Sequence, residues 1–251
     1  MEAIRQLINS LKPAEIDDVR IGLHWIGVTA RVQDKLTCGL ASTVPASHDH
    51  RSDFDVPEAG RLAQLSGLEL AEWALSDHPT RTGVGLAAIN AMLEPCPDLW
   101  EEINAEQVIL RYAEQGPVGL LGRFPFIPRL REKLKQLYVF ELNPQPGEYG
   151  TDDMKAILPD CAVVAITGMT LVNHTFEKVI SYRSPDSISL VMGPTTPVSP
   201  VLFDYGIDLI SGTIVEKIEP VMRCLSQGGA YRQLHQAGTR LVTIQSPRLK
   251  Q

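Results

Sequence analysis

Two histidines and several aspartates gather in one polar segment, and this cluster has the composition of a metal site. His48 and His50 flank Asp49, and Asp53 and Asp55 follow closely. Imidazole and carboxylate groups bind zinc and related metals, but such a site needs three or four ligands, and no third ligand follows at the spacing of a helical turn. His48 and His50 are therefore candidate metal ligands, with a solvated polar loop as the alternative.

Glu141 is the acidic residue whose position suggests direct contact with a ligand. It lies in an apolar segment at residues 137–142, and it follows Gly122, which ends the preceding apolar segment, by 19 residues. In nucleotide-binding α/β domains an acid at this place accepts hydrogen bonds from ribose hydroxyls. A solvated carboxylate at a strand end is the alternative.

The loops that follow the apolar segments are rich in glycine, threonine and proline. Glycine lets the backbone approach a ligand closely, and threonine offers hydroxyl groups and helix caps. The candidate ligand-binding residues in these loops are Gly122, Arg123, Phe124, Thr167, Gly168, Thr170, Gly193, Pro194, Thr195, Thr196 and Gly212. For Gly193–Thr196, a rigid turn is the alternative.

A helix is predicted to begin just after Thr167 and Gly168, over residues 170–179. Its first turn should direct backbone N–H groups toward the loops, an arrangement that favours anions. Asn173 and His174 fall about one turn into this helix, near enough to line a pocket. For Asn173, a hydrogen bond to a neighbouring loop is the alternative.

The first of these loops, Gly122-Arg-Phe-Pro125, does not match the GxGxxG fingerprint of dinucleotide-binding domains. Phe124 and Pro125 occupy the turn where a pyrophosphate needs open backbone amides. NAD is therefore disfavoured as a cofactor. A nucleoside-like, S-adenosylmethionine-like or pterin-like compound remains compatible with the loops.

Sequence patterns of familiar catalytic centres are absent. The chain has no HExxH, no Walker phosphate loop and no GxSxG. Its cysteines, Cys38, Cys96, Cys161 and Cys224, stand apart without a CxxC pair, which disfavours a zinc knuckle or a dithiol centre. The residues themselves leave both an enzyme and a binding protein open.

The second part of the chain predicts a fold that would bring these loops together. Short apolar segments alternate with helix-like stretches, a pattern typical of parallel strands joined by right-handed crossovers. The predicted strands lie in residues 118–122, 137–142, 161–168, 187–193 and 207–212, and residues 239–245 are predicted to add an edge strand. A ligand would then lie at the carboxyl ends of the strands.

The first part of the chain does not alternate. An amphipathic helix at residues 1–13 precedes two extended segments, residues 18–32 and 36–45, which are joined by a polar turn and predicted to form an antiparallel pair. Helical patterns follow at residues 61–76, 80–94 and 104–116. We therefore expect an α/β protein with a small α+β domain at residues 1–115 and a Rossmann-like parallel-sheet domain at residues 116–251.

Composition narrows the classes of partner. The chain of 251 residues has a net charge of −7, and 44% of its residues are hydrophobic. A nucleic-acid partner would require a basic face, and none is indicated. No apolar stretch approaches the roughly 20 residues that span a bilayer, so we expect no membrane contact and a cytoplasmic location. A homodimer is the ordinary expectation for a protein of this class.

Five motifs occur in a characteristic order. They are Gly85-Leu-Ala-Ala-Ile-Asn90, Gly122-Arg-Phe-Pro125, Thr167-Gly-Met-Thr-Leu-Val-Asn173, Gly193-Pro-Thr-Thr-Pro197 and Gly206-Ile-Asp208 with Gly212-Thr213. Over nearly the whole chain, this order resembles the prokaryotic family described as "putative heavy-metal chelation" proteins. The resemblance implies an enolase amino-terminal-like domain, a Rossmann-like domain and a small-molecule site between them.

The resemblance also implies a role in metal homeostasis. The implied activity is condensation or hydrolysis of a pterin-, flavin- or siderophore-like molecule, or of another metal-chelating ligand, and Asn90 would reach the cleft from the first domain. For Asn90, an amide on the helix surface or a packing contact is the alternative. A non-enzymatic protein that binds or delivers a metal chelate is a second reading. A methyltransferase using S-adenosylmethionine is a third, opposed by the first loop.

This chain departs from the family pattern at two positions. Arg123 stands where histidine is frequent, and His174 stands where glycine is frequent. Because a guanidinium has no lone pair, Arg123 cannot ligate a metal and instead favours an anionic ligand. His174 is the candidate that would restore a metal ligand or an acid–base group nearby, and His174 and Glu141 are the candidate catalytic residues.

Overall fold

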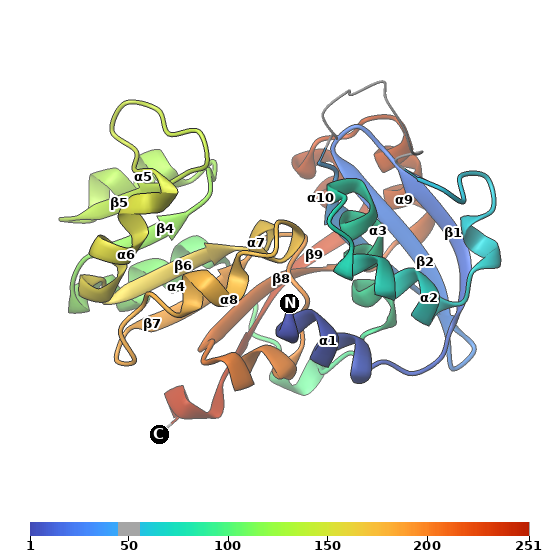
Figure 1. Ribbon diagram of the computed structural model, residues 1–251, viewed down its shortest axis with the longest axis horizontal. Coiled ribbons are helices and arrows are strands. Elements are labelled where there is room, and N and C mark those ends of the chain that lie inside the picture. Colours follow the sequence, from blue (N-terminus) through green and yellow to red (C-terminus); the bar gives the residue numbers. More distant parts are fainter. Residues whose placement is uncertain (45–55, 251) are drawn as a thin grey trace.

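The computed structural model describes residues 1–44 and 56–250, and its strands form two sheets (Figure 1). The small antiparallel sheet contains β1 (Glu15–Ile21), β2 (Trp25–Val32) and β3 (Lys35–Ser42). The large sheet contains β4 (Val118–Leu121), β5 (Leu137–Phe140), β6 (Val163–Thr167), β7 (Ile188–Met192), β8 (Leu209–Val215) and β9 (Thr239–Gln245). The predicted α/β class is confirmed. His48 and His50 lie outside the described residues.

Helices surround both sheets. They are α1 (Glu2–Asn9), α2 (Gly67–Glu72), α3 (Pro79–Met92), α4 (Ala105–Tyr112), α5 (Ile127–Lys133), α6 (Met154–Ile157), α7 (Met169–Val172), α8 (Phe176–Ile180), α9 (Ile218–Ser226) and α10 (Tyr231–Gly238). Within the described ranges, none of these helices has the length and apolar character needed to cross a membrane.

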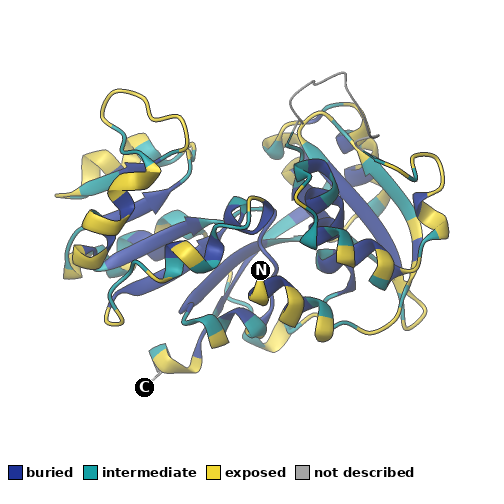
Figure 2. Ribbon diagram, viewed as in Figure 1, coloured by how far each residue is buried: buried dark blue, intermediate teal, exposed yellow. Residues whose placement is uncertain are grey.

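The large sheet has the predicted parallel core. Its strand order is β5-β4-β6-β7-β8-β9, with β4 to β8 parallel and β9 added antiparallel at the edge. Helices α4 and α5 cover one face, where Val108, Ile109 and Leu130 pack on the strands, and α6, α7 and α8 cover the other face. The strands are therefore buried on both faces (Figure 2), which explains their continuous apolar sequences.

The small sheet has three strands where the sequence predicts two. The first extended segment turns back at residues 22–24, so it forms both β1 and β2. The predicted turn between β2 and β3 is present, and Gln33 and Asp34 have φ angles of 48° and 65°. Positive φ at both central residues matches a hairpin turn to the twist of its strands, and Asp tolerates that conformation.

Helices from distant parts of the sequence enclose the small sheet. Helix α3 packs on one face of the sheet, against β2 and β3. Helices α9 and α10 pack on the opposite face, where Val221 of α9 and Leu234 of α10 form a cluster with Leu40 of β3 (Figure 1). The approach of α3 is close at Gly39, where a Cβ atom would lie 2.2 Å from the Ala87 carbonyl oxygen. One face of the small sheet is thus covered by helices from the last third of the chain.

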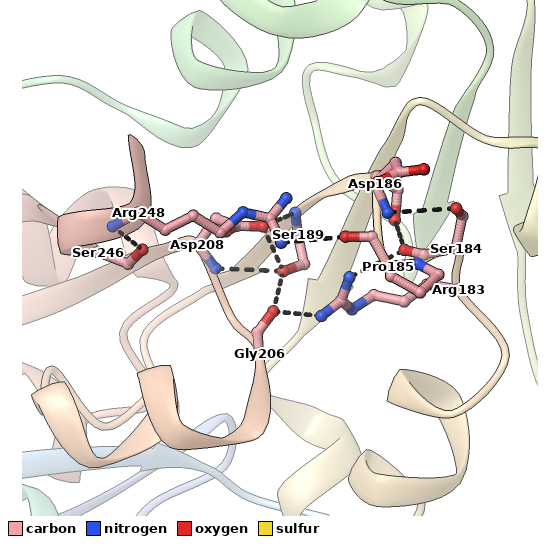
Figure 3. A network of polar contacts seen from close by, with 10 residues as sticks. Arg183, Ser184, Pro185, Asp186, Ser189, Gly206, Asp208, Ser246 and Arg248 are labelled. Carbon is pink, nitrogen blue, oxygen red and sulfur yellow. Dashed lines mark hydrogen bonds and ion pairs between the residues drawn. The ribbon is translucent and has the colours of Figure 1, made fainter. Parts of the chain in front are cut away.

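A polar network fixes the amino ends of β7 and β8 (Figure 3). The Asp208 carboxylate, 1% exposed, accepts hydrogen bonds from the Ser189 amide at 2.8 Å and the Ser189 hydroxyl at 2.9 Å. Arg248 Nε lies 3.3 Å from the other carboxylate oxygen. The Gly206 carbonyl accepts from Arg183 Nη2 at 2.6 Å. The Gly206-Ile-Asp208 motif therefore serves the fold at the end of the sheet opposite the candidate site.

Candidate functional site

The carboxyl ends of the strands of the large sheet form one row. Leu121 pairs with Phe140 and Ile166, and Met192 pairs with Thr167 and Ser211. The residues that follow these positions must therefore emerge side by side at one edge of the sheet. The strand order reverses between β4 and β6, which is where α/β sheets bind ligands.

A cleft of about 1310 Å³ opens above this edge. One side is lined by the loops after β4, β5, β6 and β7, and the other by residues of β2, β3 and α10, including Trp25, Ser42 and Tyr231. Its volume exceeds the roughly 300–1,000 Å³ of most small-molecule sites. Both the small and the large sheet therefore contribute walls to a single cleft.

Most of the predicted site residues lie together in this cleft. Those that line it are Gly122, Arg123, Phe124, Glu141, Thr167, Gly168, Thr170, Asn173, His174, Gly193, Pro194 and Thr195. Asn90, Thr196 and Gly212 do not line it. A ligand role for the lining residues stays a prediction. The contacts of each side chain within the protein show which of its hydrogen-bonding atoms remain available to a ligand.

Glu141 presents a free carboxylate. It follows β5, its amide donates to the Tyr149 carbonyl at 3.0 Å, and its side chain is partly buried in the cleft wall. Among the described residues, no side chain or amide hydrogen-bonds to this carboxylate, and the nearby Arg123 guanidinium interacts with it only electrostatically. Glu141 can therefore accept hydrogen bonds from hydroxyl or amino groups of a ligand, or bind a cation.

Arg123 is already engaged. Its Nε and Nη2 donate to the two carboxylate oxygens of Glu148 at 3.0 and 2.6 Å, and Nη2 also donates to the Asn143 carbonyl at 2.7 Å. Hydrogen bonds from Arg123 lower the pKa of Glu148 to about 2. The charge of Arg123 is thus neutralised within the protein, and its main contribution is to hold the loop after β5 against the loop after β4.

The helix predicted after Gly168 is interrupted. Helix α7 ends at Val172 and α8 begins at Phe176, with His174 between them at a φ of 56°. Asn173 Oδ1 accepts from the amide and hydroxyl of Thr175, at 3.3 and 2.6 Å, so this side chain stabilises its own turn and not a neighbouring loop. Positive φ is easiest for glycine, which gives a physical reason for the glycine that the family resemblance leads us to expect at position 174.

The start of α7 is a poorer anion site than predicted. Thr167 Oγ1 accepts the Met169 amide at 3.3 Å, and the Thr170 hydroxyl donates to the Thr167 carbonyl at 2.8 Å. One of the first amides is therefore capped by the chain itself, and a four-residue helix sums few peptide dipoles.

His174 keeps one ring nitrogen free. Its Nε2 lies 3.0 Å from the Ala74 carbonyl oxygen, in the segment before α3. Because a carbonyl oxygen only accepts, Nε2 carries the proton, and in the neutral ring Nδ1 then bears the lone pair. His174 thus lines the cleft as a fixed imidazole with an available acceptor or ligand atom.

The loop after β7 is anchored to the small sheet. Thr195 Oγ1 accepts the Ser42 amide at 3.0 Å, and Asn90 Nδ2 donates to the carbonyls of Thr195 and Leu40 at 3.1 and 2.8 Å. Asn90 therefore has the packing role that was its alternative interpretation. Thr196 lies against Gly168, where a Cβ atom would come within 2.6 Å of the Thr196 hydroxyl oxygen.

Sequence reasoning missed several residues that line the cleft. Lys178 and Tyr182 follow His174 by four and eight residues, a helical spacing that could have placed all three on one face. Trp25 and Tyr231 gave no such signal, because the small sheet and α10 approach the cleft only through tertiary packing.

Comparison with models of known protein families shows to which family the chain belongs. The DUF364 family, described as "Putative heavy-metal chelation", matches residues 104–243, more than half of the chain. A second family with the same description, DUF4213, matches residues 4–93. The chain belongs to the DUF364 family.

Individual relatives agree with this assignment. An uncharacterized protein of Methanocaldococcus jannaschii is 27% identical, and the alignment covers 88% of each chain. Crystal structures of two DUF364-family proteins of unknown function share the fold. The one from Desulfitobacterium hafniense has a TM-score of 0.82 at 24% identity, over 98% of each chain. The one from Pyrococcus horikoshii has a TM-score of 0.80 at 19% identity, over 97% of this chain and 98% of its own.

The described residues of this family member do not supply a complete metal site. Within residues 1–44 and 56–250, no three His, Cys, Asp or Glu side chains gather closely enough to hold a metal ion. Burial raises the pKa of Cys38 to about 12 and that of Cys161 to about 11, so in the absence of a metal both are protonated thiols at neutral pH. In the cleft, no described residue forms a hydrogen bond with His174 Nδ1 or with the Glu141 carboxylate, so both are available as single metal ligands.

Proposed function

We propose that this chain binds an organic small molecule that chelates a metal, in the cleft above the carboxyl edge of the large sheet. One observation carries the proposal: the cleft lies where the strand order reverses and contains the carboxylate of Glu141, to which no described residue donates a hydrogen bond. Such an edge is the ordinary ligand site of an α/β sheet. The family description supports the metal-linked part of the proposal.

The donor set favours a chelate over a bare ion. Heavy transition metals take four or more ligands, and the described residues include no group of three His, Cys, Asp or Glu side chains, so the cleft offers only single donors such as His174 Nδ1 or the Glu141 carboxylate. The remaining ligands would come from the organic molecule. Exposed Lys178, which has no ion-pair partner among the described side chains, would attract the carboxylates or phenolates that such chelators carry.

A pterin-, flavin- or siderophore-like ligand fits this chemistry. Its hydroxyl or amino groups would donate to Glu141, and its flat or apolar parts would lie on cleft walls such as Phe124 and Met169. A nucleoside-like compound would use Glu141 in the same way, through ribose hydroxyls.

Condensation or hydrolysis of the bound molecule is the second candidate function. The position of His174 favours it, because a neutral imidazole held through Nε2 can accept a proton at Nδ1. Delivery of an unchanged chelate needs no such group. Turnover of the identified ligand by the wild-type chain, lost in His174→Gln, would support catalysis over delivery.

Native mass spectrometry with metal analysis of the freshly purified chain tests the binding proposal. We expect a retained organic molecule together with a metal, both lost in Glu141→Gln. The control is Glu132→Gln, because Glu132 is an exposed glutamate of α5 that does not line the cleft. Retention of the same ligand and metal by Glu141→Gln at wild-type occupancy would overturn the proposal.

A further inference from the structure

The cleft extends along most of the sheet edge. It is lined by Glu141 after β5 at one end and by Leu241 and Val242 of β9 at the other. Five strand-to-strand steps separate β5 from β9, and at about 4.8 Å per step they span about 24 Å. A compact ligand that reaches Glu141 would therefore leave the β9 end of the cleft uncovered.

The β9 end has a different chemistry from the Glu141 end. Its walls include the rings of Trp25 from β2 and Tyr231 from α10, together with the aliphatic side chains of Leu241 and Val242. The rings of Trp25 and Tyr231 lie 5.7 Å apart, at an angle of 54°. Adjacent tilted rings of this kind offer a face and an edge to a third ring, which would pack against both.

Tyr231 is held by a side-chain hydrogen bond, and Trp25 is held by the pairing of its strand. The Tyr231 hydroxyl lies 2.9 Å from Thr213 Oγ1, and Tyr231 begins α10, which packs beside β9. Burial raises the pKa of Tyr231, so its ring stays uncharged at neutral pH. Trp25 begins β2 and pairs with Ser42, whose hydroxyl lies 3.0 Å from Thr195 Oγ1. A ring that stacks here would displace no salt bridge among the described residues.

We propose that Trp25 and Tyr231 form a second subsite of the cleft, which takes the flat, uncharged aromatic ring of a second small molecule. This inference rests on the proposed function, because it calls the subsite the second one on the ground that the first molecule is assigned to the Glu141 end. It adds that the two ends bind independently, so the cleft can hold two ligands at once.

Ligand-observed NMR and Trp fluorescence quenching with caffeine, a flat and uncharged ring system, test the subsite. We expect weak saturable binding to the wild-type chain and no comparable binding of cyclohexanecarboxamide, a saturated compound. Loss of the Trp25 ring in Trp25→Leu should weaken caffeine binding by about five- to tenfold, the effect of one aromatic contact. Trp25→Phe, which keeps a smaller ring, should retain most of the binding.

Two further variants separate this inference from the proposed function. Trp100→Leu is the matched control, because Trp100 packs under Arg240 and does not line the cleft. Glu141→Gln should bind caffeine as well as the wild type does, even though it loses the retained chelate. Equal caffeine binding by Trp25→Leu, or its loss in Glu141→Gln, would overturn the second subsite. The chelate proposal has its own test: it fails if mass spectrometry shows that Glu141→Gln retains the ligand and metal, whatever the result with caffeine.

Discussion

At the scale of single residues, the charged side chains that line the cleft are of two kinds. Some already form ion pairs within the protein, and others remain available to a ligand. Arg123 and Arg129 each make a two-point ion pair, with Glu148 and Glu106, and so contribute little net charge to a ligand. Glu141 makes no such ion pair with any described residue. The chemistry of the site therefore depends on a few unpaired groups and not on its total of charged residues.

His174 is the residue whose loss should affect binding most directly. His174→Ala removes the Nδ1 acceptor and the contact of Nε2 with Ala74. We expect the affinity for the retained ligand to fall about tenfold or more, as for loss of a buried hydrogen bond to a charged or metal-bound group. Isothermal titration with the ligand identified by mass spectrometry would measure this. His235→Ala, which changes an exposed histidine outside the cleft, should bind normally. Unchanged affinity in His174→Ala would rule out a ligand role for this imidazole.

The ion pair of Arg123 with Glu148 has a consequence for pH. The pKa of Glu148 is lowered to about 2, chiefly by hydrogen bonds from Arg123, whereas an unfolded glutamate titrates near ~4.3. Since the folded pKa lies below the unfolded one, the pair stabilises the folded chain fully above about pH 4.3, and this contribution is lost as the pH falls through about 2.

In Arg123→Gln we therefore expect the pKa of Glu148 to rise toward its ordinary value. Carboxyl NMR titration would measure the change. Arg129→Gln is the matched control, because Arg129 lowers the pKa of Glu106 instead. It should raise the pKa of Glu106 and leave Glu148 unchanged. A pKa near 2 for Glu148 in Arg123→Gln would show that another group sets it.

At the scale of elements, the strands of the large sheet could be predicted because each is a short apolar segment bounded by glycine or proline. The break between α7 and α8 could not, because the apolar positions of residues 170–179 continue through it and His174 adopts positive φ without being glycine. The third strand of the small sheet was missed for a similar reason. Residues 18–32 remain extended on both sides of Gly22, whose close packing on Leu225 becomes visible only in three dimensions.

Asp208 gives a stability prediction at this scale. Asp208→Ala leaves the buried Ser189 amide and hydroxyl without their acceptor and removes the ion pair with Arg248. We expect the free energy of unfolding to fall by about 3 kcal/mol. Urea unfolding would measure it, and Asp204→Ala, at an exposed position nearby, should cost little. Ligand affinity should persist in Asp208→Ala under folding conditions, because the network lies at the opposite end of the sheet. A loss of less than about 0.5 kcal/mol would mean that water replaces the carboxylate.

At the scale of the whole molecule, the cleft is assembled from segments that are remote in sequence. The row of loops could be expected once parallel strands were predicted, since their carboxyl ends share one edge. The opposite wall could not, because it depends on the small sheet lying beside β8 and on α9 and α10 packing against it. The family resemblance suggested a site between two domains, but only the packing shows Trp25 and Tyr231 in its wall.

The two sheets share one continuous apolar core, which extends from Ile4 and Val84 to Ile166 and Ile210. We therefore expect them to unfold together. Asn90 lies at their seam, where its Nδ2 donates to Leu40 of the small sheet and to Thr195 in the loop after β7. Asn90→Asp preserves the shape of the side chain but replaces the donor with an acceptor that faces two carbonyl oxygens.

In Asn90→Asp we expect the free energy of unfolding to fall by about 2–3 kcal/mol, the cost of a buried group left without its hydrogen bonds. We also expect weaker ligand binding, even though Asn90 does not line the cleft, because Thr195 loses an anchor to α3. Urea unfolding followed by both far-ultraviolet circular dichroism and Trp fluorescence would measure the first effect, and titration with the retained ligand the second. Asn9→Asp, at an exposed end of α1, is the control and should leave both unchanged. Two separate transitions in the wild-type chain would contradict the shared core, whereas normal binding by a destabilised Asn90→Asp would show that the seam does not shape the cleft.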